Sequence, residues 1–387
     1  MNNIFTLPPQ IQYILQTLEQ AGHAAYLVGG CVRDYLLGKR PHDFDICTSA
    51  LPEETMALFD RCIPTGIAHG TVTVLYDGMQ AEVTVFRREG NYSDHRHPDG
   101  VEFTRDLTED LARRDFTVNA MAMDCRGNLQ DPWGGQADLQ AGILRCVGDP
   151  QKRLREDALR MHRGLRFSAQ LGFALDPLTR SAIAENAPYC RYVAAERVQV
   201  ELTKTLLSPR PQVAGSMIAM GLLEAFFPKD TPCDLHTLSY VAPDKHLRYT
   251  RFLYLLNTCD CQQVLRNLRM DKITVRSVSR AVAAAREGLP TDILTMKQLM
   301  SREDELTVRC VCACGEYDRL IALRDTVLAS GEPYLLRHLA VTGADLLQLG
   351  IKGHETGILL RSLLDAVLEN PALNETETLL HLAATLK

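Results

Sequence analysis

The chain has 387 residues, of which 46% are hydrophobic and 23% charged, and its formal net charge is −6. This composition is typical of a globular protein of two or three domains, and the negative charge argues against a general nucleic-acid coat. The twelve cysteines have no CxxC spacing, which favours reduced, packed thiols over disulfides or zinc sites. The sequence has no long apolar run and no signal peptide at its N-terminus, so we expect a cytoplasmic protein without a membrane partner.

The first 140 residues or so alternate short β-like runs with helical segments. Residues 11–20 are predicted to form a helix, and strands are predicted at 25–28, 44–46, 71–76 and 81–86. Asp77-Gly78 between the last two strands predicts a β-hairpin. Gly29-Gly30 ends the first strand just before a helical stretch at 32–37. We therefore expect a small α+β sheet domain in this part of the chain.

From about Glu156 the strand signals stop, and apolar residues recur at helical spacing. The segment 156–167 is predicted as part of one helix, Pro209 and Pro211 mark a break, and further helices follow to the C-terminus. Arg and Lys are frequent at 151–170 and 191–210. An RNA enzyme of negative net charge would need such a local concentration of cations.

Two aspartates, Asp43 and Asp45, lie two residues apart on a predicted strand. Their side chains leave the same face of that strand, so the carboxylates converge there. Paired carboxylates suit Mg²⁺, which takes oxygen ligands together with substrate phosphates. Glu82, in a candidate neighbouring strand, is a third carboxylate for the same face. Because DxD alone also occurs in glycosyltransferases, the inference rests on the longer pattern GGxxRD followed by DxD.

Several residues around this pattern are suited to binding a nucleotide. Gly30 opens a helix whose N-terminus attracts phosphate, and Arg33 lies one turn further on. Arg114, one of two adjacent arginines, could bind the triphosphate, although a basic helix start is the plainer interpretation. Asp115 or Asn119 could bind a ribose hydroxyl.

The segment 156–167 places Asp157, Arg160 and Arg163 at i, i+3 and i+6, with Arg166 further round the helix. Such a stripe is usually a solvated ion-pair face. Cytosine and adenine, however, both present an amino donor beside an unprotonated ring nitrogen. An aspartate that accepts from the amine and an arginine that donates to the nitrogen would select both bases, since guanine and uracil present a carbonyl there. Asp157 and Arg160 could thus select C and A without a nucleic-acid template.

In chain order, the segments LVGGCVRD, DFDI, AEVTVFR, RRDFTVNAMA, DPWGG, EDALRMHRGLRF and AAERVQVEL resemble the class II tRNA nucleotidyltransferases. That family comprises the CCA-adding enzymes and the related bacterial poly(A) polymerases, and the resemblance covers roughly residues 20–210. It implies that Asp43 and Asp45 ligate Mg²⁺ and that Glu82 is the third catalytic carboxylate. It implies nucleotide contacts from Gly30, Arg33, Arg114, Asp157, Arg160, Arg163 and Arg166.

The same resemblance implies an α+β fold, in which a nucleotidyltransferase-type head with a small mixed β-sheet precedes an all-helical neck, body and tail. We place the head at 1–145, the base-recognising neck at 146–208, the body at 209–300 and the tRNA-binding tail at 301–387. The expected activity is addition of C, C and A to the tRNA 3′ end from CTP and ATP. We expect the tRNA acceptor arm as partner, and a monomer or homodimer.

Alternatives within and outside the family stay open. An A-adding tRNA nucleotidyltransferase or a poly(A) polymerase would use the same chemistry, and the lack of a basic C-terminal extension disfavours the latter. The segment 88–98 resembles the flexible loop of members that add the terminal A, which disfavours a CC-only enzyme. A DxD glycosyltransferase would leave the segment 156–167 unexplained, and a non-catalytic RNA-binding protein would not need the aspartate pair.

Overall fold

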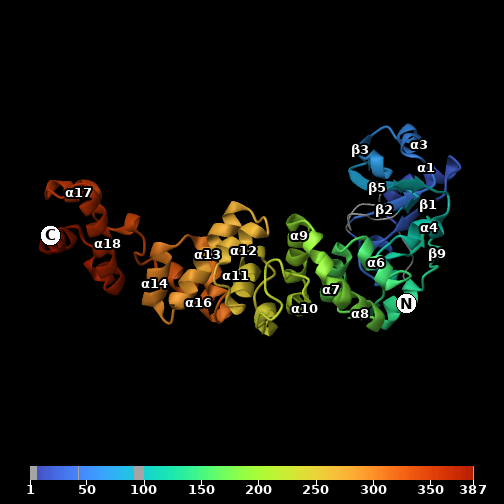
Figure 1. The fold of residues 1–387 in the computed structure, drawn as a ribbon. Helices are drawn as coiled ribbons and strands as arrows, with labels where there is room; N and C mark the ends of the chain where they lie inside the picture. Colours follow the sequence, from blue (N-terminus) through green and yellow to red (C-terminus); the bar gives the residue numbers. More distant parts are fainter. Residues whose placement is uncertain (1–6, 42, 91–99, 387) are drawn as a thin grey trace. The chain divides into compact units, whose positions relative to one another are not determined.

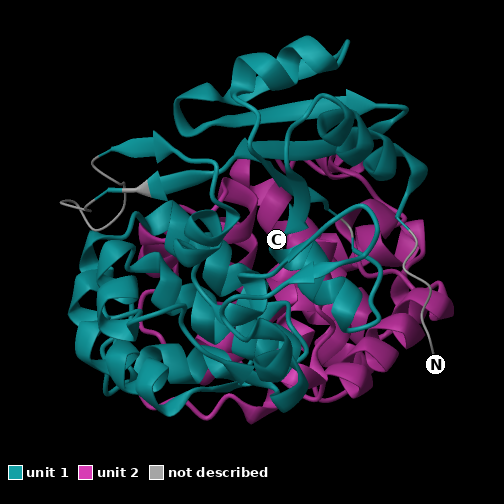
Figure 2. Ribbon diagram, turned by 90° about the vertical axis from the view of Figure 1, so that its right-hand side faces the viewer, with its two compact units in different colours: residues 1–231 teal, residues 232–387 magenta. Residues whose placement is uncertain are grey.

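The computed structural model describes residues 7–41, 43–90 and 100–386. The chain divides into two compact units, unit 1 at residues 1–231 and unit 2 at 232–387 (Figure 2). The expected division into head, neck, body and tail is finer than these two units, so its boundaries stay a prediction.

The N-terminal part of unit 1 contains a seven-stranded mixed sheet of order β3-β4-β5-β2-β1-β8-β9 (Figure 1). Within it β2 and β5 are parallel, whereas the other neighbouring strands are antiparallel. Its strands are β1 (Ala25–Val28), β2 (Asp45–Thr48), β3 (Cys62–Gly66), β4 (Thr71–Tyr76), β5 (Met79–Val85), β8 (Ala122–Met123) and β9 (Leu129–Gln130). Two small sheets pair β6 (Arg87–Glu89) with β7 (Val101–Phe103) and β10 (Ile143–Leu144) with β11 (Ala174–Leu175). The predicted mixed sheet is confirmed.

The predicted β4–β5 hairpin is also confirmed. Tyr76 pairs with Met79 across a two-residue turn, in which Asp77 has φ 45° and Gly78 has φ 76°. Two successive positive φ angles give the turn a twist that matches the twist of the flanking strands. The hairpin fixes the register of β5 against β4, and β5 in turn pairs with β2.

Helix α1 (Pro9–Gln20) packs on this sheet. Its buried residues Ile11, Ile14, Leu15 and Leu18 follow the spacing of one helix face. Each of these side chains contributes about 1.5–3 kcal/mol when fully buried. The other short elements of this part are α2 (Gly30–Leu36), α3 (Pro52–Leu58), α4 (Leu107–Ala112), α5 (Gly135–Ala141), η1 (Ile67–His69) and η2 (Thr117–Asn119).

The rest of unit 1 is mostly helical, with α6 (Pro150–Glu156), α7 (Leu159–Leu171), α8 (Pro177–Asn186), η3 (Ala187–Tyr192), α9 (Ala195–Leu206) and α10 (Val213–Ala219). The prediction of one continuous helix over 156–167 was wrong. Asp157 has φ −137° and ψ 106°, so the chain is extended between α6 and α7. The Asp157 carboxylate accepts the backbone N–H of Leu159. Local bonds of this kind let aspartate start a helix more readily than continue one.

Unit 2 is helical throughout its described residues. It consists of α11 (Lys245–Leu255), α12 (Cys261–Asn267), α13 (Lys272–Glu287), α14 (Ile293–Arg302), α15 (Glu305–Cys312), α16 (Tyr317–Ser330), α17 (Gly343–Gln348), α18 (His354–Glu369) and α19 (Thr376–Thr385), with η4 (His236–Tyr240), η5 (Leu336–His338) and η6 (Pro371–Leu373). Its buried apolar residues form separate clusters, one around α11, α13 and α15 and another around α17–α19. In the described part of the chain, no helix has the length and apolar character needed to cross a membrane.

Candidate active site

Most of the predicted site residues line one cavity of about 640 Å³ in unit 1. A cavity of this volume accommodates a ligand the size of a nucleotide. Of the three predicted catalytic carboxylates, only Asp45 lines it, while Asp43 and Glu82 do not. All the residues predicted to bind the nucleotide are present: Gly30, Arg33, Arg114, Asp157, Arg160, Arg163 and Arg166.

The three carboxylates nevertheless lie near one another in the sheet. Asp45 begins β2 and is directly opposite Glu82 on the parallel strand β5, and Asp43 lies two residues before Asp45. Partial desolvation and the negative charges of Glu82 and Asp43 raise the pKa of Asp45, while Arg114 lowers it. In the described residues, no three His, Cys, Asp or Glu side chains converge closely enough to hold a metal ion by themselves. The candidate metal ligands are therefore two or three carboxylates, and their negative charges are not fully balanced by the neighbouring cations.

Gly29 brings the backbone close to these carboxylates. It has φ 73° and ψ −134°, a conformation that other residues rarely adopt. A Cβ at position 29 would lie 3.3 Å from Nη1 of Arg114 and 3.6 Å from Oδ2 of Asp45. At Gly30 a Cβ would only meet Nη2 of Arg33 at 3.5 Å, an ordinary contact. Of the two glycines, Gly29 is thus the one whose side chain must be absent.

Arg114 lies beside the carboxylates with part of its hydrogen-bonding capacity unused. Its Nη2 donates to Oδ2 of Asp110 at 3.1 Å. Burial alone would lower the pKa of Arg114, but Asp110 outweighs that effect and the pKa is raised. Its buried Nε has no hydrogen-bond partner among the described residues. Because an unsatisfied buried donor is costly, this N–H is suited to an anionic ligand.

A chain of hydrogen bonds joins α2 to α7 along the cavity. Nη1 of Arg33 donates to Oδ1 of Asn119 at 2.7 Å, and Nδ2 of Asn119 donates to Asp115 at 3.1 Å. Nε of Arg163 donates to Oδ2 of Asp115 at 2.7 Å, and the backbone N–H of Phe116 donates to Oδ1. Burial opposes the ionisation of Asp115, but Arg163 and these hydrogen bonds lower its pKa to about 2. Asp115 is thus a fixed anion that orients cavity arginines.

Asp157 is held by a residue of α9. Nη2 of Arg197 donates to Oδ2 of Asp157 at 2.9 Å, and Nη1 donates to Oδ1 at 3.3 Å. Together with the N–H of Leu159, this bidentate contact fixes the carboxylate beside the break between α6 and α7. Asp157 and Arg197 both line the cavity.

Arg160 is held from a different direction. Its Nη1 donates to Oε2 of Glu156 at 2.7 Å and to the carbonyl of Arg153 at 3.0 Å. Its Nη2 donates to the carbonyl of Arg113 at 3.2 Å. Asp157 and Arg160, predicted to read the base together, therefore line the same cavity but are each positioned by other residues.

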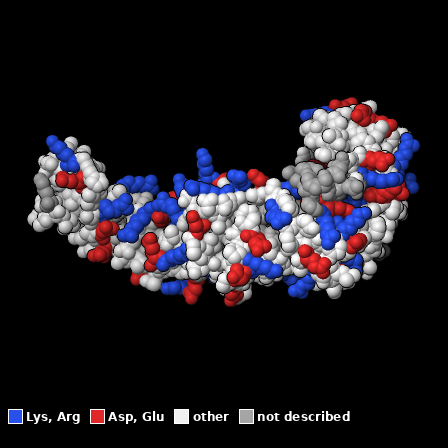
Figure 3. Space-filling model, viewed as in Figure 1, with Lys and Arg blue, Asp and Glu red and all other residues white. Residues whose placement is uncertain are grey.

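Several further residues, for which the sequence predicts no role in the site, also line this cavity: His69, Arg87, Phe167, Arg197 and Lys204. Arg197 and Lys204 belong to α9, which packs against α7 (Figure 1). The basic character of 191–210 was the available signal for these two. On the visible surface, Lys and Arg are interspersed with Asp and Glu (Figure 3). The cavity itself is basic, because arginines predominate among the charged residues that line it, although the net charge of the chain is −6.

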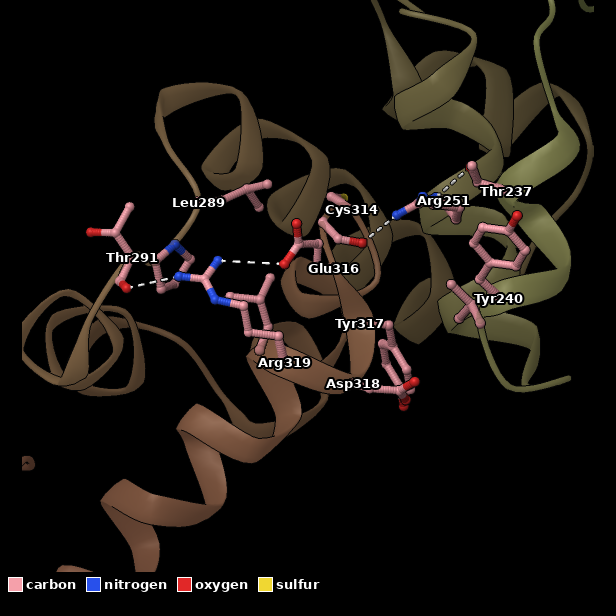
Figure 4. Close-up of a pocket in the computed structure, with 14 residues that line it drawn as sticks. Thr237, Tyr240, Arg251, Leu289, Thr291, Cys314, Glu316, Tyr317, Asp318 and Arg319 are labelled. Atoms are coloured by element: carbon pink, nitrogen blue, oxygen red, sulfur yellow. Dashed lines mark hydrogen bonds and ion pairs between the residues drawn. The ribbon is translucent and has the colours of Figure 1, made fainter.

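A second cavity, of about 690 Å³, lies within unit 2 and contains none of the predicted residues (Figure 4). Its two arginines already donate to the backbone. Arg251 donates to the carbonyls of Ala313 and Gly315 at 3.0 and 2.6 Å. Arg319 donates to the carbonyl of Thr291 at 3.0 Å. The candidate active site is therefore the cavity of unit 1.

Comparisons with known proteins identify the family of this chain. The family described as "Poly A polymerase head domain" matches residues 25–145, and that described as "Probable RNA and SrmB- binding site of polymerase A" matches 172–231. The chain is 39% identical to the CCA-adding enzyme of Levilactobacillus brevis over 380 residues, which is 95% of each chain. It is 38% identical to that of Lactiplantibacillus plantarum, over 97% of each chain.

A solved structure supports the same relationship along the whole chain. The Bacillus stearothermophilus CCA-adding enzyme in complex with CTP has a TM-score of 0.82 and 33% identity, covering 98% of this chain and 99% of that one. The Thermotoga maritima enzyme complexed with tRNA has a TM-score of 0.72 at 19% identity, which shows the shared fold alone. The chain therefore belongs to the CCA-adding enzymes, a family of nucleotidyltransferases.

Proposed function

We propose that this enzyme adds C, C and A to the 3′ end of tRNA, using CTP and ATP without a nucleic-acid template. The proposal rests on one cavity, where Asp45 of the carboxylate pair meets several arginines and the candidate base-reading residues Asp157 and Arg160. A nucleotide there would place its phosphates near Asp45 and its base near Asp157.

Mg²⁺ fits the donors of this site. The mutual repulsion that raises the pKa of Asp45 is relieved by a divalent cation, and hard carboxylate oxygens are the ligands that Mg²⁺ prefers. Asp43 and Asp45 would hold the ion, with Glu82 beside them and phosphate oxygens completing its coordination. When bound, the ion supplies charge stabilisation for the attacking 3′-oxygen and the departing pyrophosphate.

The residues of the chain position the reactants. Gly29 and Gly30 let the backbone approach the phosphates at the start of α2. Arg33 and Arg114 supply donors for the triphosphate, which carries more negative charge as pyrophosphate leaves. Asp43 and Asp45 are placed to orient the 3′-hydroxyl of the RNA toward the α-phosphorus. These residues would gain most of their catalytic effect by fixing the geometry of an in-line displacement.

Base selection follows from the direction of hydrogen bonds. Arg197 donates to Asp157 and so fixes the orientation of its carboxylate, and Glu156 fixes the guanidinium of Arg160. An amino group of cytosine or adenine would donate to Asp157, and Arg160 would donate to the adjacent ring nitrogen. Uracil and guanine would set a carbonyl oxygen against Asp157, leaving both groups unpaired.

The remaining parts of the chain would serve the RNA. We propose that the head at 1–145 carries catalysis and the neck at 146–208 base recognition, while the body at 209–300 and tail at 301–387 contact the tRNA acceptor arm. The segment 88–98, expected to act in the addition of A, falls mostly outside the described residues. All twelve cysteines are free thiols, which suits action in the reducing cytoplasm.

The decisive experiment incubates the full chain with tRNA that lacks its 3′-terminal CCA, Mg²⁺, and each nucleoside triphosphate separately and together. We expect two additions with CTP alone and three with CTP and ATP, after which extension stops. Long A tracts from ATP alone would identify a poly(A) polymerase, and activity only on CC-ended tRNA would identify an A-adding enzyme. Asp45→Asn should abolish addition, whereas Asp60→Asn, at an exposed acid outside the cavity, should retain it.

A further inference from the structure

Phe167 lies among the arginines of the cavity. Phe167 belongs to the C-terminal half of α7 and lines the cavity, and it is 5% exposed. The guanidinium carbons of Arg33, Arg163 and Arg166 lie 5.2, 5.3 and 4.0 Å from its ring centroid. All three lie within the range of about 6 Å over which the ring quadrupole attracts a cation.

Each of these arginines also has an acidic partner. Arg33 pairs with Asp34 at 2.8 Å, Arg163 with Asp115 at 2.7 Å, and Arg166 with Glu201 at 2.6 Å; these acids come from three different parts of unit 1. All three guanidiniums lie against the aromatic ring of Phe167. Their mutual repulsion is thus opposed by three separate acids and by a single ring.

Two of these arginines have a nitrogen without a hydrogen-bond partner among the described residues. Arg163 uses Nε and Nη2 on Asp115, and Nη1 has no hydrogen-bond partner among the described residues. Nε of Arg166 forms an ion pair with Glu201 at 2.6 Å without a hydrogen bond of regular geometry, and Nη1 donates to Gln170; for Nη2 the described part of the chain shows no partner. Neither free nitrogen is a buried unsatisfied atom. Both groups can therefore donate to a ligand without first breaking a bond.

We propose that Phe167 is a positioning residue, whose ring holds Arg33, Arg163 and Arg166 in the arrangement that binds the incoming nucleotide. This proposal rests on the proposed function, because it assumes that the nucleotide occupies this cavity. The ring joins Arg33 of α2, on the phosphate side, to two arginines of α7, on the base side. Because the ring holds the long arginine side chains in place before binding, less of their conformational entropy is lost when the nucleotide binds.

The proposal predicts that the electron density of the ring, and not only its shape, sets nucleotide affinity. Site-specific incorporation of mono-, tri- and pentafluorophenylalanine at position 167 changes the quadrupole progressively with little change in size. We expect KM for CTP and ATP to rise stepwise, to about tenfold or more for the pentafluoro form, with kcat changed less than threefold. Phe167→Tyr, which keeps an electron-rich ring, should stay within about threefold of the wild type.

Phe116 provides a matched control. Its ring is fully buried and meets Phe167 edge-on at 6.0 Å, and among the described residues no guanidinium lies over it. The same fluorinated residues at position 116 should leave KM unchanged. Equilibrium binding of CTP to each variant gives a second readout that does not depend on turnover.

Unchanged CTP affinity and KM across the series at position 167 would overturn the proposal, as would an equal effect at position 116. A fall in kcat with constant KM would also overturn it, because the ring would then act on chemistry rather than on binding. Failure of the unmodified enzyme to extend tRNA with CTP and ATP would instead refute the proposed function. The two failures are therefore distinguishable.

Discussion

Replacing Asp115 with Asn removes one buried negative charge and keeps the size of the side chain. Asp115 is 7% exposed and pairs with Arg163. Its pKa is about 2 in the folded chain, against an ordinary value of 3.8. The difference corresponds to about 2 kcal/mol of stabilisation of the native state at pH 7. We expect Asp115→Asn to lower the free energy of unfolding of unit 1 by about that amount.

The sign of the pH dependence follows from the direction of the pKa shift. A carboxyl whose pKa is lowered by folding stabilises the native state above its unfolded pKa, here 3.8. That stabilisation is lost as the pH falls through the folded pKa of about 2. The difference in stability between the wild type and Asp115→Asn should therefore be about 2 kcal/mol at pH 7 and roughly half of that near pH 3.

The measurement is urea unfolding followed by the fluorescence of Trp133, the single tryptophan, which lies in unit 1 and packs beside the cluster around Val28 and Leu111. Asp60→Asn, at an exposed acid in the same unit, controls for a general effect of lost charge. A difference between wild type and Asp115→Asn that is the same at pH 7 and pH 3 would refute the electrostatic explanation.

Three further predictions test other parts of the site. Gly29→Ala should lower kcat/KM at least tenfold in the tRNA extension assay, because the position has φ 73° and a Cβ would press on Arg114. The control in the same assay is Gly100→Ala, because a Cβ at position 100 meets open space. Arg197→Gln should increase incorporation of U and G relative to C and A, because it releases Asp157, and unchanged selectivity in four-nucleotide competition would contradict this. Burial lowers the pKa of His162 from 6.5 to about 4, so native stability should fall as the pH drops from 6.5 toward 4. In urea titrations His162→Gln should show a smaller fall over that range, and an equal fall would exclude His162 as its cause.

Features set by local chain geometry were predicted well. Alternation along strands placed Glu82 beside Asp45, and the structure confirms this register. At position 162 the sequence favours a structural or partly exposed histidine over a catalyst, and in the structure the side chain is fully buried, with Nε2 2.9 Å from the carbonyl of Leu222. The roles of Asp43, Asp45 and Glu82 in catalysis stay predictions. Register and helix faces depend on spacing, which is visible in a single sequence.

Features set by contacts between distant segments were not predicted. Helical periodicity continues through Asp157, so nothing local signals that Arg197, forty residues later, binds its carboxylate. Apolar periodicity predicts that Phe167 is buried, and the structure confirms this, but periodicity does not report which cations surround a buried ring. Both sets of contacts were missed because a partner in tertiary structure is invisible to propensity and spacing.

The bidentate contact between Arg197 and Asp157 has a consequence for how the enzyme should respond to its solution. In the proposed base site, the Asp157 carboxylate already carries its own counter-ion, so an incoming nucleobase would meet a neutral dipole and not a bare anion. Screening by dissolved salt weakens attraction between net charges over roughly 10 Å, but it does not change the direction in which a hydrogen bond points. Rising ionic strength should therefore weaken binding of the triphosphate, while the ratio of correct to incorrect nucleotides incorporated stays constant. Fidelity in this enzyme would be a matter of orientation, and affinity a matter of charge.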